Sequence, residues 1–266
     1  MLRTRVITAL ILVSGLLSLL FAAPASWVEI VFALTSGAAA WEWAGLMNGK
    51  PVLRVGYGFA VFLACIAVNV FPATSFAPLW AVASLFWLLL APFWLARAWR
   101  LVDHAVAGYL LGAFLIVPTW AALVALYSRG PWVLILAMAA IWTADVAAYF
   151  TGRAFGKHKL APSISPGKTR EGAYGAVVGV MIYGLLAWPA IGLFAPKGQG
   201  GWLVLALILV LVTILSIMGD LFESLLKRQA GIKDSSNLLP GHGGILDRID
   251  SLTSTLPLIA LALQVL

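Results

Sequence analysis

Residues 220–250 concentrate ionisable side chains in a chain that is otherwise almost entirely apolar. Ionisable groups beside a bilayer are costly, so a concentration of them indicates a functional site. Carboxylates with few histidines and no cysteine favour a hard cation such as Mg²⁺, which leaves coordination positions for phosphate oxygens. Lysine and arginine can hold phosphoryl oxygens, arginine through its bidentate fork. We therefore expect a metal-dependent reaction on a phosphate-bearing substrate at a membrane surface, carried by residues from this set: Asp220, Glu223, Lys227, Arg228, Lys233, Asp234, His242, Asp247, Arg248 and Asp250.

Helical spacing indicates how these groups come together. If the apolar helix before Asp220 continues, then Asp220, Ser224 and Lys227, or the arginine after it, lie on one face. Asp247 and Asp250 share a face at the start of the last apolar run. Glycines and a proline between the two helices let the chain fold back closely. A salt-bridge network that ends two membrane spans is the alternative, but it does not call for this glycine-rich turn.

A second polar segment, residues 152–172, carries five lysines or arginines against one glutamate. A basic loop that sets topology and attracts anionic lipid headgroups is the structural interpretation. The end of the loop directly precedes a helix whose positive N-terminal end can bind phosphate. An aspartate in the preceding span has the helical spacing to share a face with the arginine that opens the loop. The segment therefore predicts further substrate-binding groups: Asp145, Arg153, Ser165, Lys168 and Thr169.

The sequence Gly167-Lys168-Thr169 does not form a nucleotide-binding P-loop. That motif needs a glycine five residues before its Gly-Lys pair, and a β-strand before the loop. Pro162 stands at that position, and the segment upstream is an apolar span. A P-loop is therefore excluded.

The composition is that of an integral membrane protein. Of 266 residues, 62% are apolar and 10% are charged, whereas soluble domains are about half apolar and a quarter charged. The net charge of +7 reports membrane topology in such a chain, so nucleic-acid binding is not expected. Cys65 is the single cysteine, which excludes a disulfide framework and a thiolate metal site.

Apolar runs divide the chain into about nine segments long enough to cross roughly 30 Å of hydrocarbon. The fold class predicted is therefore an all-α, polytopic bundle of about nine transmembrane helices. Residues 1–104 form N-terminal spans, and residues 105–266 form a catalytic membrane region with polar loops at 152–172 and 223–249. The spans are expected at 6–22, 27–46, 53–71, 76–96, 105–127, 132–151, 173–194, 202–222 and 250–266.

Basic residues predict the orientation of the bundle. Alternate connections collect fifteen lysines and arginines on the side of the N-terminus and both polar loops, against Arg129 and Lys197 on the other side. The positive-inside rule then places the N-terminus and the loops in the cytoplasm and the C-terminus outside. Residues 1–26 also fit a cleavable secretory signal, and either outcome leaves the later loops on the same side.

Two blocks of the sequence resemble those of bacterial phosphatidate cytidylyltransferases (CDP-diacylglycerol synthases). The resemblance covers residues 140–266 closely, while the N-terminal half is similar only as a set of apolar spans. The family signature is matched by Ser224-Leu-Leu-Lys227-Arg228, Lys233-Asp234-Ser235-Ser236 and Leu239-Pro240-Gly241-His242-Gly243-Gly244-Ile-Leu-Asp247-Arg248-Ile-Asp250. An earlier block is matched by Ala144-Asp145, Tyr149-Phe150, Gly152-Arg153 and Ile164-Ser165-Pro166-Gly167-Lys168-Thr169-Arg170-Glu171-Gly172.

The resemblance implies transfer of the cytidylyl group of CTP to phosphatidic acid, which gives CDP-diacylglycerol and pyrophosphate. It implies a multi-pass protein of the bacterial inner membrane, in contact with membrane lipids and with its site facing the cytoplasm. Mg²⁺ is the expected cofactor, and a second cation is left open. By carry-over, Asp220 and Asp247 ligate the metal and Asp145 and Asp250 support them. Phosphates are held by Arg153, Lys168, Lys227, Arg228 and Arg248, hydroxyl donors are Ser165, Thr169 and Ser224, and His242 is either substrate-binding or a capping residue.

Three other interpretations are open. A CTP-dependent kinase of polyprenol or phytol type also uses CTP at a membrane, but transfers the γ-phosphoryl group to an alcohol. A secondary transporter would carry its ionisable groups near the bilayer midplane, whereas most acids here cluster at one level near the cytoplasm. A structural scaffold does not account for so many costly groups in one place.

Spans 105–127 and 173–194, which contain glycine pairs four residues apart, are compatible with a homodimer but do not require one.

Overall fold

The computed structural model describes residues 2–68, 76–191 and 201–265. Over these residues the fold is helical, as the apolar runs predict, and each predicted span coincides with a helix. Residues 69–71, 192–194 and 266 of the predicted spans, and Lys197, lie outside the described residues. The elements are α1 (Leu2–Ala22), α2 (Ala25–Leu46), α3 (Pro51–Val68), α4 (Ala77–Leu85), η2 (Phe86–Leu90), α5 (Ala91–Arg97), α6 (Ala105–Ser128), α7 (Pro131–Phe155), β1 (Lys159–Ala161), β2 (Ser165–Thr169), α8 (Arg170–Ile191), α9 (Gly201–Gln229) and α10 (Leu246–Val265).

Six helices in the described residues are long and apolar enough to cross a membrane. They are α3, the continuous α4–η2–α5 helix, α6, α7, α8 and α9. The helices α1, α2 and α10 coincide with predicted spans but do not meet the same measure of length and hydropathy. The membrane character of the fold is therefore confirmed, and the count of nine spans stays a prediction.

Both polar loops are shorter than predicted, because the helices beside them extend past the apolar runs. The helix α7 continues to Phe155, α9 continues to Gln229, and α10 begins at Leu246. Polar side chains on the added turns can reach water while the backbone keeps its helical hydrogen bonds. The extension of α9 is the condition under which Asp220, Ser224 and Lys227 share a face.

The loop after α7 contains a β-hairpin that the all-helical prediction missed. Strands β1 and β2 are antiparallel, with Lys159 opposite Thr169 and Ala161 opposite Ser165. The segment has no alternation of apolar and polar residues, and Pro166 stands inside β2. Proline is tolerated in a strand that is an edge, which both strands of a two-stranded sheet are. The hairpin leads directly into α8.

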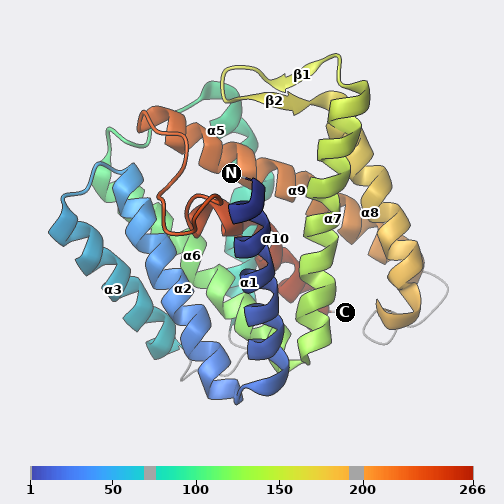
Figure 1. Ribbon diagram of the computed structural model, residues 1–266, viewed down its shortest axis with the longest axis horizontal. Helices are drawn as coiled ribbons and strands as arrows, with labels where there is room; N and C mark the ends of the chain where they lie inside the picture. The colour runs from blue at the N-terminus through green and yellow to red at the C-terminus, as the bar shows by residue number, and fades with distance from the viewer. Residues whose placement is uncertain (1, 69–75, 192–200, 266) are drawn as a thin grey trace.

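Figure 1 shows the helices as a bundle, with the N-terminus, the β1–β2 hairpin and the segment between α9 and α10 toward one end. The long helix α9 crosses behind α7, and α8 lies beside α7. Elements far apart in the sequence therefore meet near the hairpin. This is the grouping that the distribution of basic residues predicts for the cytoplasmic side.

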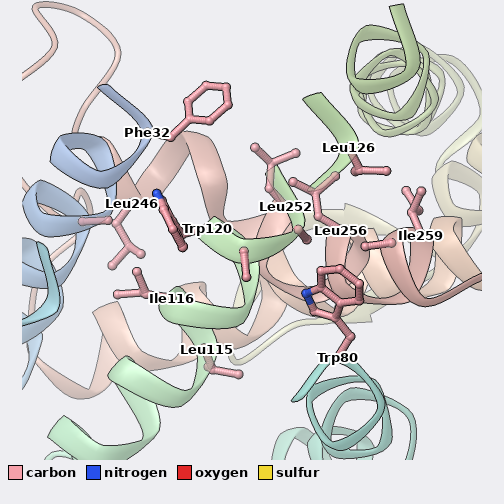
Figure 2. Packing of buried hydrophobic residues seen from close by; sticks show 14 of the residues in the cluster. Phe32, Trp80, Leu115, Ile116, Trp120, Leu126, Leu246, Leu252, Leu256 and Ile259 are labelled. Carbon is pink, nitrogen blue, oxygen red and sulfur yellow. The ribbon is translucent and has the colours of Figure 1, made fainter. Parts of the chain in front are cut away.

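The core is built around α10, whose residues 251–257 are all buried. Figure 2 shows side chains from α2, α4, α6 and α10 gathered in the largest core cluster, which includes Phe32, Trp80, Trp120, Leu252 and Leu256. Small residues let α9 approach α10 closely. A Cβ on Gly219 would lie 2.7 Å from the Asp250 carbonyl oxygen and 2.5 Å from Ser254 Oγ. The close approach at Gly219 brings the next residue of α9, Asp220, to the level at which α10 begins.

Candidate active site

A cavity of about 610 Å³ lies between the β1–β2 hairpin and the ends of α7, α9 and α10. Among the described residues, its lining contains cations from both polar segments and carboxylates from α7 and from residues 220–250. The structure thus brings together two groups of residues that are about 75 positions apart in the sequence. Ten of the thirteen predicted site residues line it: Asp145, Arg153, Ser165, Lys168, Thr169, Asp220, Lys227, Asp247, Arg248 and Asp250.

An ion pair joins the hairpin to α9 across this cavity. Lys168 Nζ lies 2.6 Å from Asp220 Oδ2, and both side chains are partly exposed. The other oxygen of Asp220 accepts a hydrogen bond of 3.3 Å from Ser224 Oγ, one turn further along α9. From α7, Asp145 Oδ1 lies 3.5 Å from its hydrogen-bond donor Ser216 Oγ. A cation from one polar segment is therefore already held by a carboxylate of the other.

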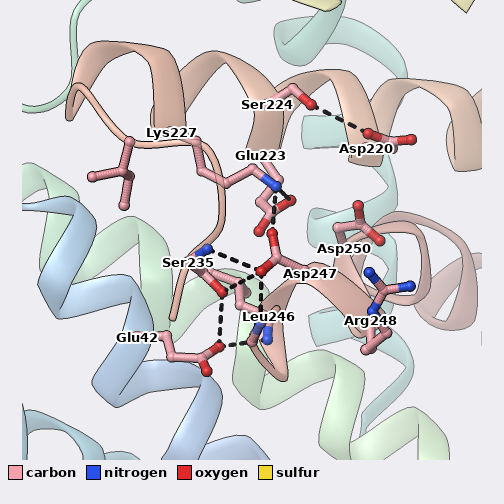
Figure 3. A network of polar contacts seen from close by, with 12 residues as sticks. Glu42, Asp220, Glu223, Ser224, Lys227, Ser235, Leu246, Asp247, Arg248 and Asp250 are labelled. Atoms are coloured by element: carbon pink, nitrogen blue, oxygen red, sulfur yellow. Dashed lines mark hydrogen bonds and ion pairs between the residues drawn. The ribbon is translucent and has the colours of Figure 1, made fainter. Parts of the chain in front are cut away.

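Lys227 is held between two buried carboxylates. Its Nζ lies 2.6 Å from Glu223 Oε2 and 2.5 Å from Asp247 Oδ1, and Figure 3 shows the three side chains converging. The side chains of Glu223 and Asp247 are only 4% and 5% exposed. Glu223 Oε1 is buried and has no hydrogen-bond partner among the described residues. The sequence places Glu223 in the charged segment but gives it no individual role, although its position four residues before Lys227 was a signal for this pair.

Asp247 is oriented by the glycine-rich turn that precedes α10. Its Oδ2 accepts hydrogen bonds from the Ser235 backbone N–H (2.9 Å), from Ser235 Oγ (2.8 Å) and from the Gly244 backbone N–H (2.8 Å). Gly243 has φ +80°, and a Cβ there would lie 2.7 Å from Asp247 Oδ2. Glycine is required at this position by both the backbone conformation and the close approach. Asp247 and Asp220 line the same cavity but have different hydrogen-bond partners.

A second residue without a predicted role, Glu42 of α2, closes the other side of this turn. Its side chain is fully buried and accepts hydrogen bonds from Ser236 Oγ and from the backbone N–H groups of Ile245 and Leu246, and its Oε2 lies 3.1 Å from Ser235 Oγ. In the sequence, Glu42 is an acid within an apolar span, and a hydrogen bond to a neighbouring helix explains it as well as a functional role does. Its partners are about 200 residues away along the chain, so no local pattern could identify them.

On the hairpin side of the cavity, Arg153 and Thr169 are held by local hydrogen bonds within α7 and at the start of α8. Arg153 donates a hydrogen bond of 3.3 Å to Tyr149 OH one turn earlier in α7, so Arg153 lies on the face that helical spacing predicts. Thr169 is buried, and its Oγ1 accepts the Gly172 backbone N–H at 3.1 Å. This is the bond of a helix N-cap, here at the start of α8. Thr169 therefore organises the end of the hairpin as well as lining the cavity.

Three predicted site residues do not line the cavity. Ser224 contacts it only through its hydrogen bond to Asp220. Arg228 is exposed and donates to the Ile232 carbonyl oxygen at 3.4 Å. His242 lies in the glycine-rich turn, where its carbonyl oxygen accepts Arg248 Nε at 3.1 Å. Its Nδ1 is buried without a hydrogen-bond partner in the part of the chain that the structure describes.

The lining has one more carboxylate than it has cations. Among the residues that the structure describes, five aspartates face four lysines and arginines, and neither a cysteine nor a histidine lines the cavity. Oxygen donors without nitrogen or sulfur fit a hard cation such as Mg²⁺. Within residues 2–68, 76–191 and 201–265, no three acidic, histidine or cysteine side chains are arranged to enclose a metal by themselves. The donor set therefore fits a cation that completes its coordination with water and phosphate oxygens, as Mg²⁺ commonly does.

Comparison with known proteins gives one family along nearly the whole chain. The sequence matches the model of the cytidylyltransferase family over residues 3–266. It is similar to the phosphatidate cytidylyltransferase of Pseudomonas aeruginosa, with 38% identity over 275 residues, covering 98% of this chain and 96% of the relative. The phosphatidate cytidylyltransferase of Haemophilus influenzae is 32% identical over 295 residues, covering 97% and 96%. That of Brucella suis is 48% identical over 128 residues, covering 48% and 45%. The similarity extends well beyond the C-terminal half that carries the motifs.

Proposed function

The chain belongs to the cytidylyltransferase family, and from that premise we propose that its charged cavity is where CTP meets phosphatidic acid. The reaction is transfer of the cytidylyl group, with CDP-diacylglycerol and pyrophosphate as products and phospholipid biosynthesis as its purpose. The observation that carries the assignment of the site is the cavity itself. Both motif blocks contribute side chains to its lining, although they are far apart in the sequence.

The chemistry requires charge neutralisation more than it requires a base. A phosphate oxygen of phosphatidate attacks the α-phosphorus of CTP and forms a new P–O bond, while the bond to the β-phosphate bridging oxygen breaks and pyrophosphate leaves. Both reactants are anions, so their approach is unfavourable until cations offset the charge. Positioned cations that stabilise the spread charge of the transition state are the main catalytic resource in phosphoryl transfer.

The cavity offers four fixed cations for this purpose. Lys168 and Arg153 come from the hairpin side, and Lys227 and Arg248 come from the side of α9 and α10. We assign phosphate binding to all four, and Arg228, which is exposed and does not line the cavity, is a further candidate. The hydroxyl groups of Ser165, Thr169 and Ser224 are the candidate donors to phosphate oxygens, and His242 is a candidate through the turn that it occupies.

Mg²⁺ is the proposed cofactor, with Asp220 and Asp247 as its ligands and Asp145 and Asp250 as supporting carboxylates. The excess of carboxylates would repel two anionic substrates, so a bound divalent cation is needed to make the cavity attractive to them. When bound, Mg²⁺ supplies positive charge to the phosphate oxygens of CTP. The protein's part is to hold these aspartates at one level and to keep Lys168 and Lys227 beside them.

We also propose that the cavity faces the cytoplasm in the bacterial inner membrane. Support comes from the distribution of basic residues, because the segments around the cavity carry most of them. CTP is cytosolic, and phosphatidate presents its phosphate at the headgroup level, so both substrates can reach a cavity there. The number of spans, the external C-terminus and a homodimer stay predictions.

A test of the reaction separates cytidylyl transfer from the kinase alternative. Purified protein in detergent is incubated with Mg²⁺, with phosphatidate or a polyprenol as the acceptor, and with CTP labelled at either the α- or the γ-phosphorus. Cytidylyl transfer predicts lipid-soluble label from α-labelled CTP, with one pyrophosphate released per lipid formed. Lipid-soluble label from γ-labelled CTP with release of CDP would instead establish a kinase.

A further inference from the structure

Glu42 links the N-terminal part of the chain to the segment that carries Asp247. It lies in α2 with no solvent exposure, although it is an ionisable residue. Its Oε1 accepts hydrogen bonds from Ser236 Oγ at 2.6 Å and the Ile245 backbone N–H at 3.0 Å. Its Oε2 accepts from the Leu246 backbone N–H at 2.6 Å and lies 3.1 Å from Ser235 Oγ. Ser236 Oγ and the two backbone N–H groups donate to Glu42, as an ionised carboxylate requires, whereas the single hydroxyl hydrogen of Ser235 is shared between Glu42 and the nearer Asp247.

Two of these donors belong to the start of α10. The first backbone N–H groups of a helix have no partner within the helix, and the helix dipole makes this end positive. A buried carboxylate at this position therefore satisfies otherwise unpaired donors and gains from the dipole. Because Asp247 is in the first turn of α10, the Glu42 carboxylate helps to fix where that turn begins.

Ser235 connects Glu42 to Asp247 directly. Its Oγ lies 3.1 Å from Glu42 Oε2 and 2.8 Å from Asp247 Oδ2, so one hydroxyl stands between the two carboxylates (Figure 3). The fit is tight, because a Cβ on Gly244 would overlap Ser235 Oγ and lie within 2.6 Å of both Glu42 oxygens. A change at Glu42 therefore cannot be absorbed without moving the turn that orients Asp247.

We propose that Glu42 is a positioning residue for the reaction: its carboxylate holds the Ser235 hydroxyl and the start of α10 so that Asp247 is presented to the cavity. The proposal rests on the proposed function, because its kinetic test measures the formation of CDP-diacylglycerol. Glu42 does not line the cavity, so it acts through Asp247 rather than on a substrate.

Glu42→Gln is the sharpest test, because the side chain keeps its size. Glutamine has one acceptor oxygen, so its NH₂ group faces two donors, and the one that is a backbone N–H cannot rotate to accept. We expect kcat to fall by about 10- to 100-fold, the usual effect of losing a residue that orients a metal-binding group. The KM for CTP should change little, and a higher Mg²⁺ concentration should be needed for half-maximal activity. Glu42→Asp, which keeps the charge, should lose less.

A second readout needs neither substrate nor metal. In Glu42→Gln, backbone hydrogen exchange should become faster over residues 235–247 and stay unchanged over residues 157–170. Glu29→Gln is the matched control, since it removes a carboxylate from the same helix and Glu29 does not line the cavity; its kcat and its exchange over residues 235–247 should equal those of the wild type.

An unchanged kcat in folded Glu42→Gln would overturn the proposal. So would exchange that rises across the whole chain, with kcat falling only as the folded fraction falls. If the wild type makes no CDP-diacylglycerol, the proposed function fails and exchange alone decides the role of Glu42. Faster exchange confined to residues 235–247 would then support it, and no change would refute it.

Discussion

The residues of the cavity show how a buried cation and its carboxylates depend on one another. Lys227 is 12% exposed and lies between Glu223 and Asp247, which are almost fully buried. Taking charges out of water is costly, and each member of such a group is tolerated because the others offset its charge. Removing one member is therefore more damaging than removing a balanced pair.

Lys227→Met should lower the free energy of unfolding by about 3–5 kcal/mol, because two buried carboxylates lose their cation. The double variant Lys227→Met with Glu223→Gln should be more stable than Lys227→Met alone, since one of the uncompensated charges is gone. Thermal unfolding in detergent measures both variants. Equal unfolding temperatures for the single and double variants would show that the charge of Glu223 does not destabilise the protein when Lys227 is absent.

Lys168→Met should lower kcat/KM by about 100-fold, because the variant removes a cation that faces the site of charge development. Lys157→Met is the matched control: it removes the same charge from the same polar segment, but Lys157 does not line the cavity. Initial rates over a range of CTP concentrations measure the effect. Equal losses in the two variants would favour the simpler interpretation, in which this segment only attracts anionic headgroups.

Sequence reasoning identified most of the charged residues that line the cavity, because cations and carboxylates are rare in an apolar chain. It missed the roles of Glu223 and Glu42 for different reasons. Glu223 has a local signal, its spacing from Lys227, and that pairing could have been predicted. Glu42 has none, because its hydrogen-bond donors are brought to it only when α2 packs beside the start of α10.

At the scale of elements, the contact between α9 and α10 sets the level at which the aspartates meet. Gly219 stands where the helices are closest, one residue before Asp220. Ser251 and Ser254 of α10 donate hydrogen bonds to the Ser216 and Leu215 carbonyl oxygens of α9, which fixes the rotation of one helix against the other. The separation of the two helices is thus determined by small residues and not by the ionisable groups.

Gly219→Ala should destabilise the protein by about 1–3 kcal/mol, since the added methyl group meets backbone atoms of α10 that cannot rotate away. It should also lower kcat, because Asp220 moves relative to Asp250. Gly56→Ala in α3 is the control, as a Cβ there meets nothing within 4 Å. Unfolding temperature and kcat are measured for both, and a Gly219→Ala protein equal to wild type in both would refute this account of the helix contact.

The elements that sequence reasoning predicted and the one it missed differ in what stabilises them. Long apolar runs specify membrane helices because the bilayer leaves no other way to satisfy the backbone. The β1–β2 hairpin lies in a polar segment where several backbone conformations are available, and within the described ranges its strands pair only with each other. Its position depends on Thr169 and the start of α8, which a local pattern does not reveal.

At the scale of the whole molecule, the largest core cluster contains residues from both sides of position 104. Glu42 makes the same connection through polar contacts, from α2 to the turn before α10. The N-terminal spans therefore support the cavity directly, and we expect them to be needed for a correctly formed site.

The orientation of the bundle can be tested with single cysteines. Cys65 is the one cysteine and is buried, so Cys65→Ala provides a background without reactive thiols. Asn237→Cys lies in the exposed segment after α9, and Ser26→Cys lies at the exposed start of α2. In inside-out membrane vesicles, a maleimide that cannot cross membranes should label Asn237→Cys and not Ser26→Cys. The reverse pattern would place the cavity on the external side.

The central claim is that aspartates from α9 and α10 make this cavity a site of cytidylyl transfer. The most direct test is the initial rate of CDP-diacylglycerol formation from CTP and phosphatidate by Asp220→Asn and Asp247→Asn. Asp103→Asn, which removes an exposed aspartate paired with Arg100, is the matched control. We predict rates at least about 100-fold below wild type for the two cavity variants, with an unchanged rate for the control. Wild-type rates in folded Asp220→Asn and Asp247→Asn would contradict the claim.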